Sequence, residues 1–137
     1  MKKLNPHLSF KGDCETAFRF YERVLGGKIL MIMSYGDSPL AGQVAPEWSG
    51  KVLHATLELD GQTLMGADAT PDRYQKPQGF SIAVNVTDKA EAERVFRDLS
   101  EGGVVEMPLQ GTFWAERFGM LTDRHGIPWM INCGKQG

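Results

Sequence analysis

Residues 13–27, DCETAFRFYERVLGG, have a counterpart of the same pattern in residues 88–103, DKAEAERVFRDLSEGG. Both stretches begin with Asp, a residue type that caps helix N-termini, and both end in Gly-Gly, which favours a helix stop. Between these ends, apolar residues recur on one helical face. The sequence therefore predicts two amphipathic helices, over residues 14–25 and 88–100, built from one unit used twice.

Segments rich in alternating apolar residues flank both predicted helices. We expect strands at residues 4–10, 28–35, 51–59 and 62–67, and again at 80–86, 104–109, 117–122 and 127–133. Asp60-Gly61 and His125-Gly126 mark the turns before the last strand of each set. The order is βαβββ twice, which predicts an α+β fold with modules at about 1–68 and 79–137 and a linker at 69–78.

Each predicted module has one helix, so one face of its sheet lacks a covering layer. Two such modules bury apolar surface by pairing their sheets. We therefore expect residues 1–137 to form a single domain in which the paired modules make a cup-shaped mixed sheet.

The amino-acid composition limits which binding partners and which cellular compartment we expect. The formal net charge of −2 gives no basic footprint for nucleic acid, and no apolar run is long enough to span a membrane. The N-terminal residues lack the apolar core of a signal peptide, so we expect a cytoplasmic protein. Cys14 and Cys133 have no CxxC spacing, which argues against a disulfide framework or a thiolate zinc site.

Two features of the first module have two interpretations each. Cys14 lies just inside a helix N-terminus, where it is either a thiol of lowered pKa or an inert residue at the helix start. Trp48 lies in the long loop at residues 36–50, which either covers a pocket as a lid or packs onto the body of the module.

Several motifs along nearly the whole chain carry a resemblance to a known family. They include Asn5-Pro6-His7-Leu8-Ser9-Phe10, Gly36-Asp37-Ser38-Pro39, Phe113-Trp114-Ala115, Phe118-Gly119-Met120 and Thr122-Asp123-Arg124-His125-Gly126-Ile127-Pro128-Trp129. With these motifs the chain resembles the vicinal oxygen chelate superfamily, which has the glyoxalase/bleomycin-resistance/dioxygenase fold, and within it the PhnB-like branch. The resemblance implies paired βαβββ modules that form a cup, and a homodimer.

The same resemblance implies four positions at which most enzymes of the superfamily hold a divalent metal. Carried over through the helix starts and turns, they fall on Pro6, Met65, Ser81 and Met130. None of these side chains is a good ligand for a hard or borderline divalent ion. We therefore predict no cofactor, with one alternative: a bulge turns His7 inward, and His54 and Glu58, with Asp68, complete a rearranged metal site.

Without a metal, the expected cup is apolar and is lined by methionines. Met65 and Met130 would line it with Leu8, Phe10, Ala67 and Ala83, and polar anchors would come from Ser81, Asn85, Asn132, His54, Thr56 and Glu58. Such a surface is typical of small-molecule sites. The alternative is that the methionines fill the space between the sheets as core.

Trp114, Arg117 and Phe118 form a second candidate cluster. An Arg between aromatic residues suits an anion such as a carboxylate or phosphonate, and the alternative is a surface or dimer-interface Arg.

Two functions follow from these patterns: a metal-independent protein that binds a small molecule, or a metal-dependent lyase, isomerase or dioxygenase with the rearranged ligand set. Relatives of the PhnB-like branch have also been named as demethylubiquinone methyltransferases. The sequence lacks the glycine-rich loop between a strand and a helix that a Rossmann-type nucleotide site requires.

Overall fold

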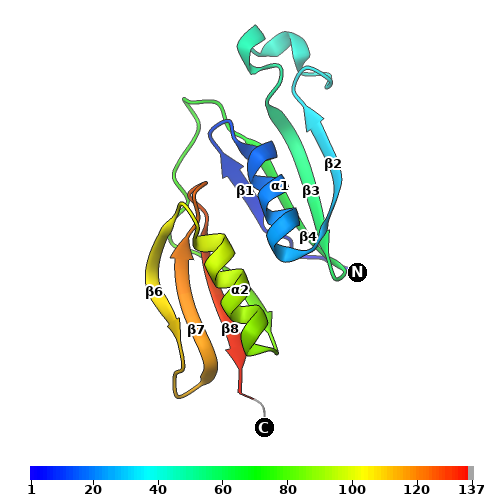
Figure 1. Ribbon diagram of the computed structural model, residues 1–137. Coiled ribbons are helices and arrows are strands. Elements are labelled where there is room, and N and C mark those ends of the chain that lie inside the picture. The colour runs from blue at the N-terminus through cyan, green and yellow to red at the C-terminus, as the bar shows by residue number, and fades with distance from the viewer. Residues whose placement is uncertain (136–137) are drawn as a thin grey trace. The chain divides into compact units, whose positions relative to one another are not determined.

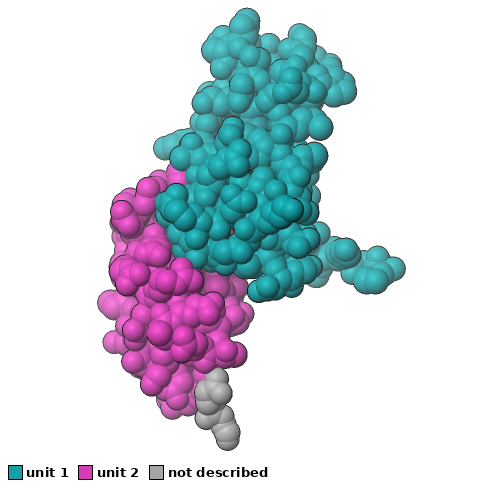
Figure 2. Space-filling model, turned by 45° about the vertical axis from the view of Figure 1, so that its right-hand side comes forward, with its two compact units in different colours: residues 1–75 teal, residues 76–137 magenta. Residues whose placement is uncertain are grey.

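The computed structural model describes residues 1–135, and these fall into two compact units (Figures 1 and 2). The units are Met1–Gln75 and Lys76–Gly137, so the boundary lies inside the predicted linker. Both units have the predicted order. Unit 1 contains β1 (His7–Phe10), α1 (Cys14–Leu25), β2 (Lys28–Ser34), β3 (Val52–Leu59) and β4 (Gln62–Asp68). Unit 2 contains β5 (Ile82–Val86), α2 (Lys89–Ser100), β6 (Val104–Gln110), β7 (Ala115–Thr122) and β8 (Pro128–Gly134).

The two sheets share one topology, with strand orders β1-β4-β3-β2 and β5-β8-β7-β6. The first strand of each unit pairs in parallel with the last, and the remaining neighbours are antiparallel. Each helix lies across one face of its own sheet (Figure 1). The α+β fold class and the duplication are therefore confirmed.

The face of each sheet that packs on the helix, called the helix face below, holds the core of the unit. In unit 1, the Phe10 and Phe18 rings lie edge to face, with centroids 6.1 Å apart, and both residues are fully buried. In unit 2, a Cβ on Gly119 would lie 2.7 Å from the Phe96 ring, so α2 sits directly on β7 there. The opposite side of each sheet is called the far face below.

The end of α1 and the start of α2 use the predicted stop and cap residues, whereas the start of α1 does not. Gly26 ends α1 in the left-handed conformation, at φ 81°, and its N–H donates to the Glu22 carbonyl. Asp88 caps α2 by accepting the Glu91 N–H at 3.2 Å. The Asp13 side chain, in contrast, makes no capping hydrogen bond. Asp68 at the end of β4 accepts the Cys14 N–H instead, at 3.0 Å.

The long loop between β2 and β3 contains two short 3-10 helices, η1 (Ala41–Gln43) and η2 (Pro46–Trp48). The Lys51 ammonium lies 6.0 Å from the Trp48 ring centroid and donates to the Gly12 carbonyl at 3.0 Å. A Cβ on Gly12 would lie 3.8 Å from the Trp48 ring. Trp48 therefore packs the loop onto the start of α1, as the second interpretation has it.

Among the described residues, no helix is both long enough and apolar enough to cross a membrane.

Candidate functional site

The far face of each sheet is defined by its strand register. His7 on β1 lies opposite Met65 on β4, and Ala83 on β5 lies opposite Met130 on β8. Residues opposite one another in neighbouring strands point to the same face. The residue opposite Met65 is therefore His7 and not Pro6, and the residue opposite Met130 is Ala83 and not Ser81, which differs from the positions carried over from the resemblance by one residue at β1 and by two at β5.

The register also corrects the expected placement of Leu8 and Phe10. Both are buried, and both belong to the helix face, since Leu8 lies opposite Gly66 and a Cβ on Gly66 would meet the Phe18 ring at 2.7 Å. They are core residues of unit 1 and do not lie on the face with Met65. The physical reason is the period of two along a strand, which reverses the face with every one-residue slip.

On the far face of unit 1, four residues stand in one row across the sheet. In strand order they are His7, Met65, Thr56 and Met31. His54 lies two residues from Thr56 along β3 and is opposite Met33 on β2. Glu58 lies on the same face, opposite Lys28 and Thr63. The predicted site residues His54, Glu58 and Met65 are thus brought onto one face.

The far face of unit 2 has a matching row made of Ala83, Met130, Met120 and Met107. A second row contains Asn85, Asn132, Phe118 and Gln110. The Asn132 amide donates to the Asn85 carbonyl oxygen at 3.2 Å. The two asparagines thereby orient each other beside the methionine row, and one donor group of Asn85 stays available to a ligand.

A cavity of about 280 Å³ opens beside the methionine row of unit 2. It lies between residues 76–81 and the strands β6, β7 and β8, and its lining includes Ser81, Glu106, Met120, Thr122 and Pro128. The predicted site residue Ser81 therefore lines this cavity. Its lining mixes a thioether and a proline ring with a few polar groups, as small-molecule sites do.

A second cavity of about 410 Å³ lies at the start of α1 in unit 1. Arg19 and Lys51 line it, but both cations have partners: Arg19 pairs with Glu15 at 3.3 Å, and Lys51 donates to a backbone carbonyl. A surface cavity whose charges already have partners is a weaker candidate than the far faces.

The predicted cluster of Trp114, Arg117 and Phe118 is divided in the structure. Trp114 packs edge to face on Phe118, with centroids 5.4 Å apart, and Phe118 belongs to the far face. Arg117 lies opposite the buried Cys133 and its guanidinium pairs with Glu93 of α2 at 3.3 Å. The interpretation of Arg117 as a surface residue fits this placement, whereas an anion clamp with both aromatic rings does not.

The residues at the superfamily's metal positions do not fit the usual divalent metal. In the observed register these positions hold the His7 imidazole and the Met65 thioether in unit 1, and Ala83 and the Met130 thioether in unit 2. Within residues 1–135, no group of three or more His, Cys, Asp or Glu side chains gathers closely enough to hold a metal ion, so His7, His54 and Glu58 do not form the rearranged set. Asp68 belongs to the helix face, where three backbone N–H groups occupy its carboxylate.

The comparisons with known proteins agree with this fold. A family model described as 3-demethylubiquinone-9 3-methyltransferase matches residues 2–132. The chain belongs to this family. Protein YjdN from Escherichia coli (strain K12) is 38% identical to this chain over 141 residues, covering 97% of the chain and 96% of the relative.

Solved structures place this family member among glyoxalase-like folds. Protein PA1353 from Pseudomonas aeruginosa is 44% identical, with a TM-score of 0.91 over 99% of this chain and 100% of that one. A putative 3-demethylubiquinone-9 3-methyltransferase, PhnB protein, from Bacillus cereus is 28% identical, with a TM-score of 0.82 over 97% and 100% of the two chains. The fosfomycin resistance protein FosX from Listeria monocytogenes shares the fold, at 13% identity and a TM-score of 0.68 over 98% and 94%. The resemblance to the PhnB-like branch is thus confirmed, and the likeness to FosX shows the fold alone.

Sequence reasoning missed the structural role of two buried carboxylates, Asp68 and Asp123, in this family member. Asp68 accepts the N–H groups of Gly12, Cys14 and Val52 at 3.0, 3.0 and 2.8 Å. It thereby joins the start of α1 to β3 and β4. The sequence indicated this role of Asp68 only by an Asp at the end of a predicted strand.

Asp123 is the buried carboxylate of unit 2, and it holds the turn between β7 and β8. One carboxylate oxygen accepts the N–H groups of His125 and Ile127, at 2.8 and 3.0 Å, and the other accepts the Trp129 indole N–H at 2.8 Å. This explains physically why Asp, a turn and Trp occur together in the Thr122–Trp129 motif.

Cys14 is the inert thiol of the two interpretations. It is fully buried, and desolvation, with a smaller contribution from the Asp68 carboxylate, raises the pKa of Cys14 far above its ordinary value. A thiol in this state is a poor nucleophile, because the thiolate is the reactive form.

Proposed function

We propose that this protein binds a small, largely apolar molecule on its far faces and does so without the divalent metal that most superfamily enzymes use. The observation that supports the proposal most directly is the type of residue at the positions where the resemblance implies metal ligands. In place of hard ligands, unit 1 has His7 and Met65 there, and unit 2 has Ala83 and Met130. Thioethers and a methyl group favour contact with an apolar ligand over a hard cation.

Unit 2 offers the better-formed binding surface of the two. The cavity of about 280 Å³ is at the small end of ligand sites and borders Met120, Ser81 and Thr122. The Asn85–Asn132 pair stands two residues further along the strands and presents carboxamide groups on the same face. We infer that the apolar part of a ligand occupies the cavity, and that a polar group on the ligand bonds to the carboxamides.

The activity in the family's name has little support from the local structure. A methyl donor of nucleotide type needs a glycine-rich turn between a strand and a helix. Among the described residues the two such connections are residues 11–13 in unit 1 and residues 87–88 in unit 2. Both are too short for that loop, so we propose a binding function first.

The first test measures metal content by mass spectrometry on tag-free protein. The protein is incubated with Zn²⁺, Mn²⁺, Fe²⁺ and Ni²⁺, and the excess is then removed. We expect much less than one metal ion per chain. Near-stoichiometric metal that disappears in His7→Ala would overturn the proposal and favour a metal-dependent enzyme.

The second test measures binding by thermal shift with a panel of small apolar and anionic compounds. Met120→Trp fills the cavity and should abolish the shift of any compound that binds there. Met107→Trp is the matched control, because Met107 stands in the same row but does not line the cavity. Equal retention of the shift in both variants would place binding outside the cavity.

We also propose that the protein is a cytoplasmic homodimer. Both cysteines are buried and unpaired, which fits a reducing compartment. The homodimer rests on the superfamily resemblance, and light scattering after size exclusion measures it directly. A monomer mass across a range of protein concentrations would contradict it.

A further inference from the structure

We propose that the far face of unit 1 binds a soft monovalent cation, Cu(I), through thioether and imidazole groups. Five side chains with N or S donors share this face. They are His7, Met31, Met33, His54 and Met65. This inference is independent of the proposed small-molecule cavity, which lies in unit 2.

The strand register brings these donors within reach of one another. His7 is directly opposite Met65, and Met33 is directly opposite His54. In the antiparallel β2–β3 pair, Cβ atoms of directly opposite residues are about 4.5–5.5 Å apart, which lets the His54 imidazole and the Met33 thioether meet over one ion.

Thr56 provides the centre of the arrangement. Met65 and Met31 flank it on β4 and β2, and His54 is two residues along β3 on the same face. His54 is therefore diagonal to both methionines, with Cβ separations of about 7–8 Å that long side chains can bridge. Because Thr56 is short, it leaves room above itself for an ion held by the His54 imidazole and the thioethers of Met31 and Met65.

The chemistry of the donors selects the ion. Thioether sulfur and neutral imidazole suit Cu(I), whereas hard cations prefer carboxylates and water. Asp68 is on the helix face with its oxygens occupied by backbone N–H groups, and Glu58 lies on the far face, opposite Lys28 and two residues from Thr56. The proposed ligands themselves, His54, Met31 and Met65, are neutral and soft. The proposed step is binding alone, with no change in the oxidation state of copper.

Unit 2 provides an internal comparison. At the positions that match His7 and His54 it has Ala83 and Phe118, so its methionine row has no imidazole beside it. We therefore expect the higher affinity in unit 1. The comparison also supplies matched control substitutions of the same chemical type in the same fold.

The affinity experiment uses Cu(I), kept reduced with ascorbate under anaerobic conditions, in competition with bicinchoninate. We expect one Cu(I) per chain. Met31→Leu/Met65→Leu keeps the side-chain volume and should weaken binding by at least about tenfold, since even an outer-shell change costs a metal site that much. Met107→Leu/Met130→Leu should change the affinity by less than about twofold, because it alters only the row of unit 2 that has no imidazole beside it.

A second readout identifies the ligands and keeps the test decisive if a variant folds poorly. The wild-type protein is labelled with ¹³C at the methionine ε-methyl groups and titrated with Ag(I), a redox-inert substitute for Cu(I). We expect the resonances of Met31 and Met65 to shift first. The proposal would be overturned by methionine shifts confined to unit 2, or by the absence of any methionine shift, which is the result expected if the ion binds to the buried thiols. In the affinity experiment, an equal loss of Cu(I) affinity in both double variants would overturn it as well.

Discussion

Replacing Asp68 by Asn tests whether one buried carboxylate holds the start of α1 onto the sheet. Asn has the same shape, but an NH₂ group replaces one carboxylate oxygen and the charge is lost. Of the three N–H groups that Asp68 now accepts, from Gly12, Cys14 and Val52, at least one then faces another donor. Hydrogen bonds to charged groups contribute about 1.5–3 kcal/mol each, and a buried donor left unpaired costs about 1–3 kcal/mol.

These effects overlap, so we expect Asp68→Asn to lower the free energy of unfolding by about 2–4 kcal/mol. For a chain of this length, about 3 °C of melting temperature is lost per kcal/mol, which predicts a fall of roughly 6–12 °C. Equilibrium urea denaturation followed by circular dichroism measures the free energy, and calorimetry measures the melting temperature.

The control is Asp72→Asn, which neutralises an exposed carboxylate of the same unit. Its hydrogen bond with Thr70 lowers the pKa of Asp72 but can be kept by the Asn carbonyl, so the denaturation midpoint should change much less than in Asp68→Asn. A loss below about 1 kcal/mol for Asp68→Asn would refute the reasoning, because it would mean that the three N–H groups find other partners at little cost.

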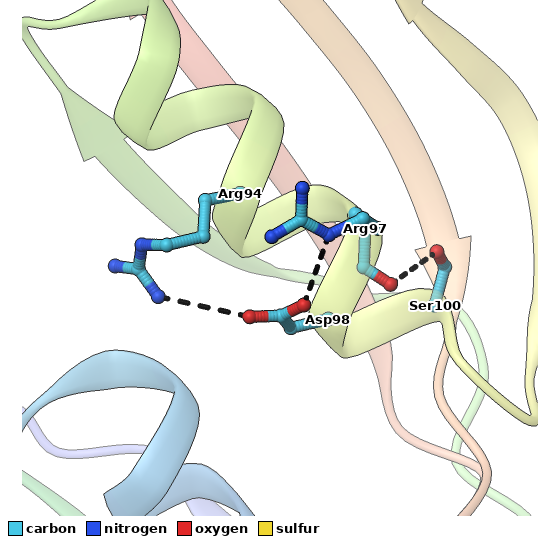
Figure 3. Close-up of polar contacts among 4 residues, drawn as sticks. All are labelled: Arg94, Arg97, Asp98 and Ser100. Carbon is cyan, nitrogen blue, oxygen red and sulfur yellow. Dashed lines mark hydrogen bonds and ion pairs between the residues drawn. The ribbon is translucent and has the colours of Figure 1, made fainter.

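Three further predictions concern packing, surface charge and the buried thiols. Gly119→Ala should lower the free energy of unfolding by about 1–3 kcal/mol, because the new Cβ would lie 2.7 Å from the Phe96 ring. The control Gly42→Ala, which has open space around its Cβ, should not lower it. The urea denaturation midpoints of the two variants test this. Asp98→Ala should change the free energy of unfolding by about 0.5 kcal/mol or less in the same assay. Arg94 and Arg97 both point at the Asp98 carboxylate (Figure 3), but all three side chains are partly or largely exposed, and exposed ion pairs contribute little. Ellman's reagent should modify both cysteines only after denaturation. Because burial raises the pKa of Cys14 above its ordinary value of 9.0, the unfolded chain releases the thiol proton first, so stability should fall as pH rises past that value.

Sequence periodicity was sufficient to predict both helices and the order of all eight strands. The helix over Cys14–Leu25 has the predicted bounds, because its apolar face and its Gly26 stop are both local signals. The second helix begins one residue later than predicted, because Asp88 is its cap and lies outside the helix. Local signals of this kind act within one turn of chain and therefore survive in a single sequence.

The facing of β1 could not be predicted from the helix starts, for a specific reason. The connection from β1 to α1 contains three residues, including Gly12 at φ 126°, whereas the connection from β5 to α2 contains two. An alignment through the helix starts hides this extra residue. Because side chains alternate between the two faces of a strand, this one-residue error in the alignment assigned Pro6 to the position that His7 occupies. It also put Leu8 and Phe10 on the wrong face.

The buried carboxylates escaped prediction for a different reason. Asp68 binds partners up to 56 residues away in the sequence, and its role exists only once β4 lies beside the start of α1. A polar residue at a strand end reads as solvent-exposed until the fold shows which N–H groups need an acceptor. The same holds for the indole of Trp129, whose partner is Asp123.

The duplication itself indicates where function has diverged. A helix-face residue fills the core between the helix and the sheet of its unit, so its replacement is costly. A far-face residue has no helix above it, so its replacement costs less. At matched far-face positions the units agree in methionine at Met65 and Met130 but differ at His7 against Ala83. The common methionines provide the soft apolar surface, and the differing residues give unit 1 imidazoles and unit 2 carboxamides. On this division, substitution of Met31 or His54 in unit 1 should change cation affinity without altering ligand binding in the cavity of unit 2, and cavity substitutions in unit 2 should do the reverse.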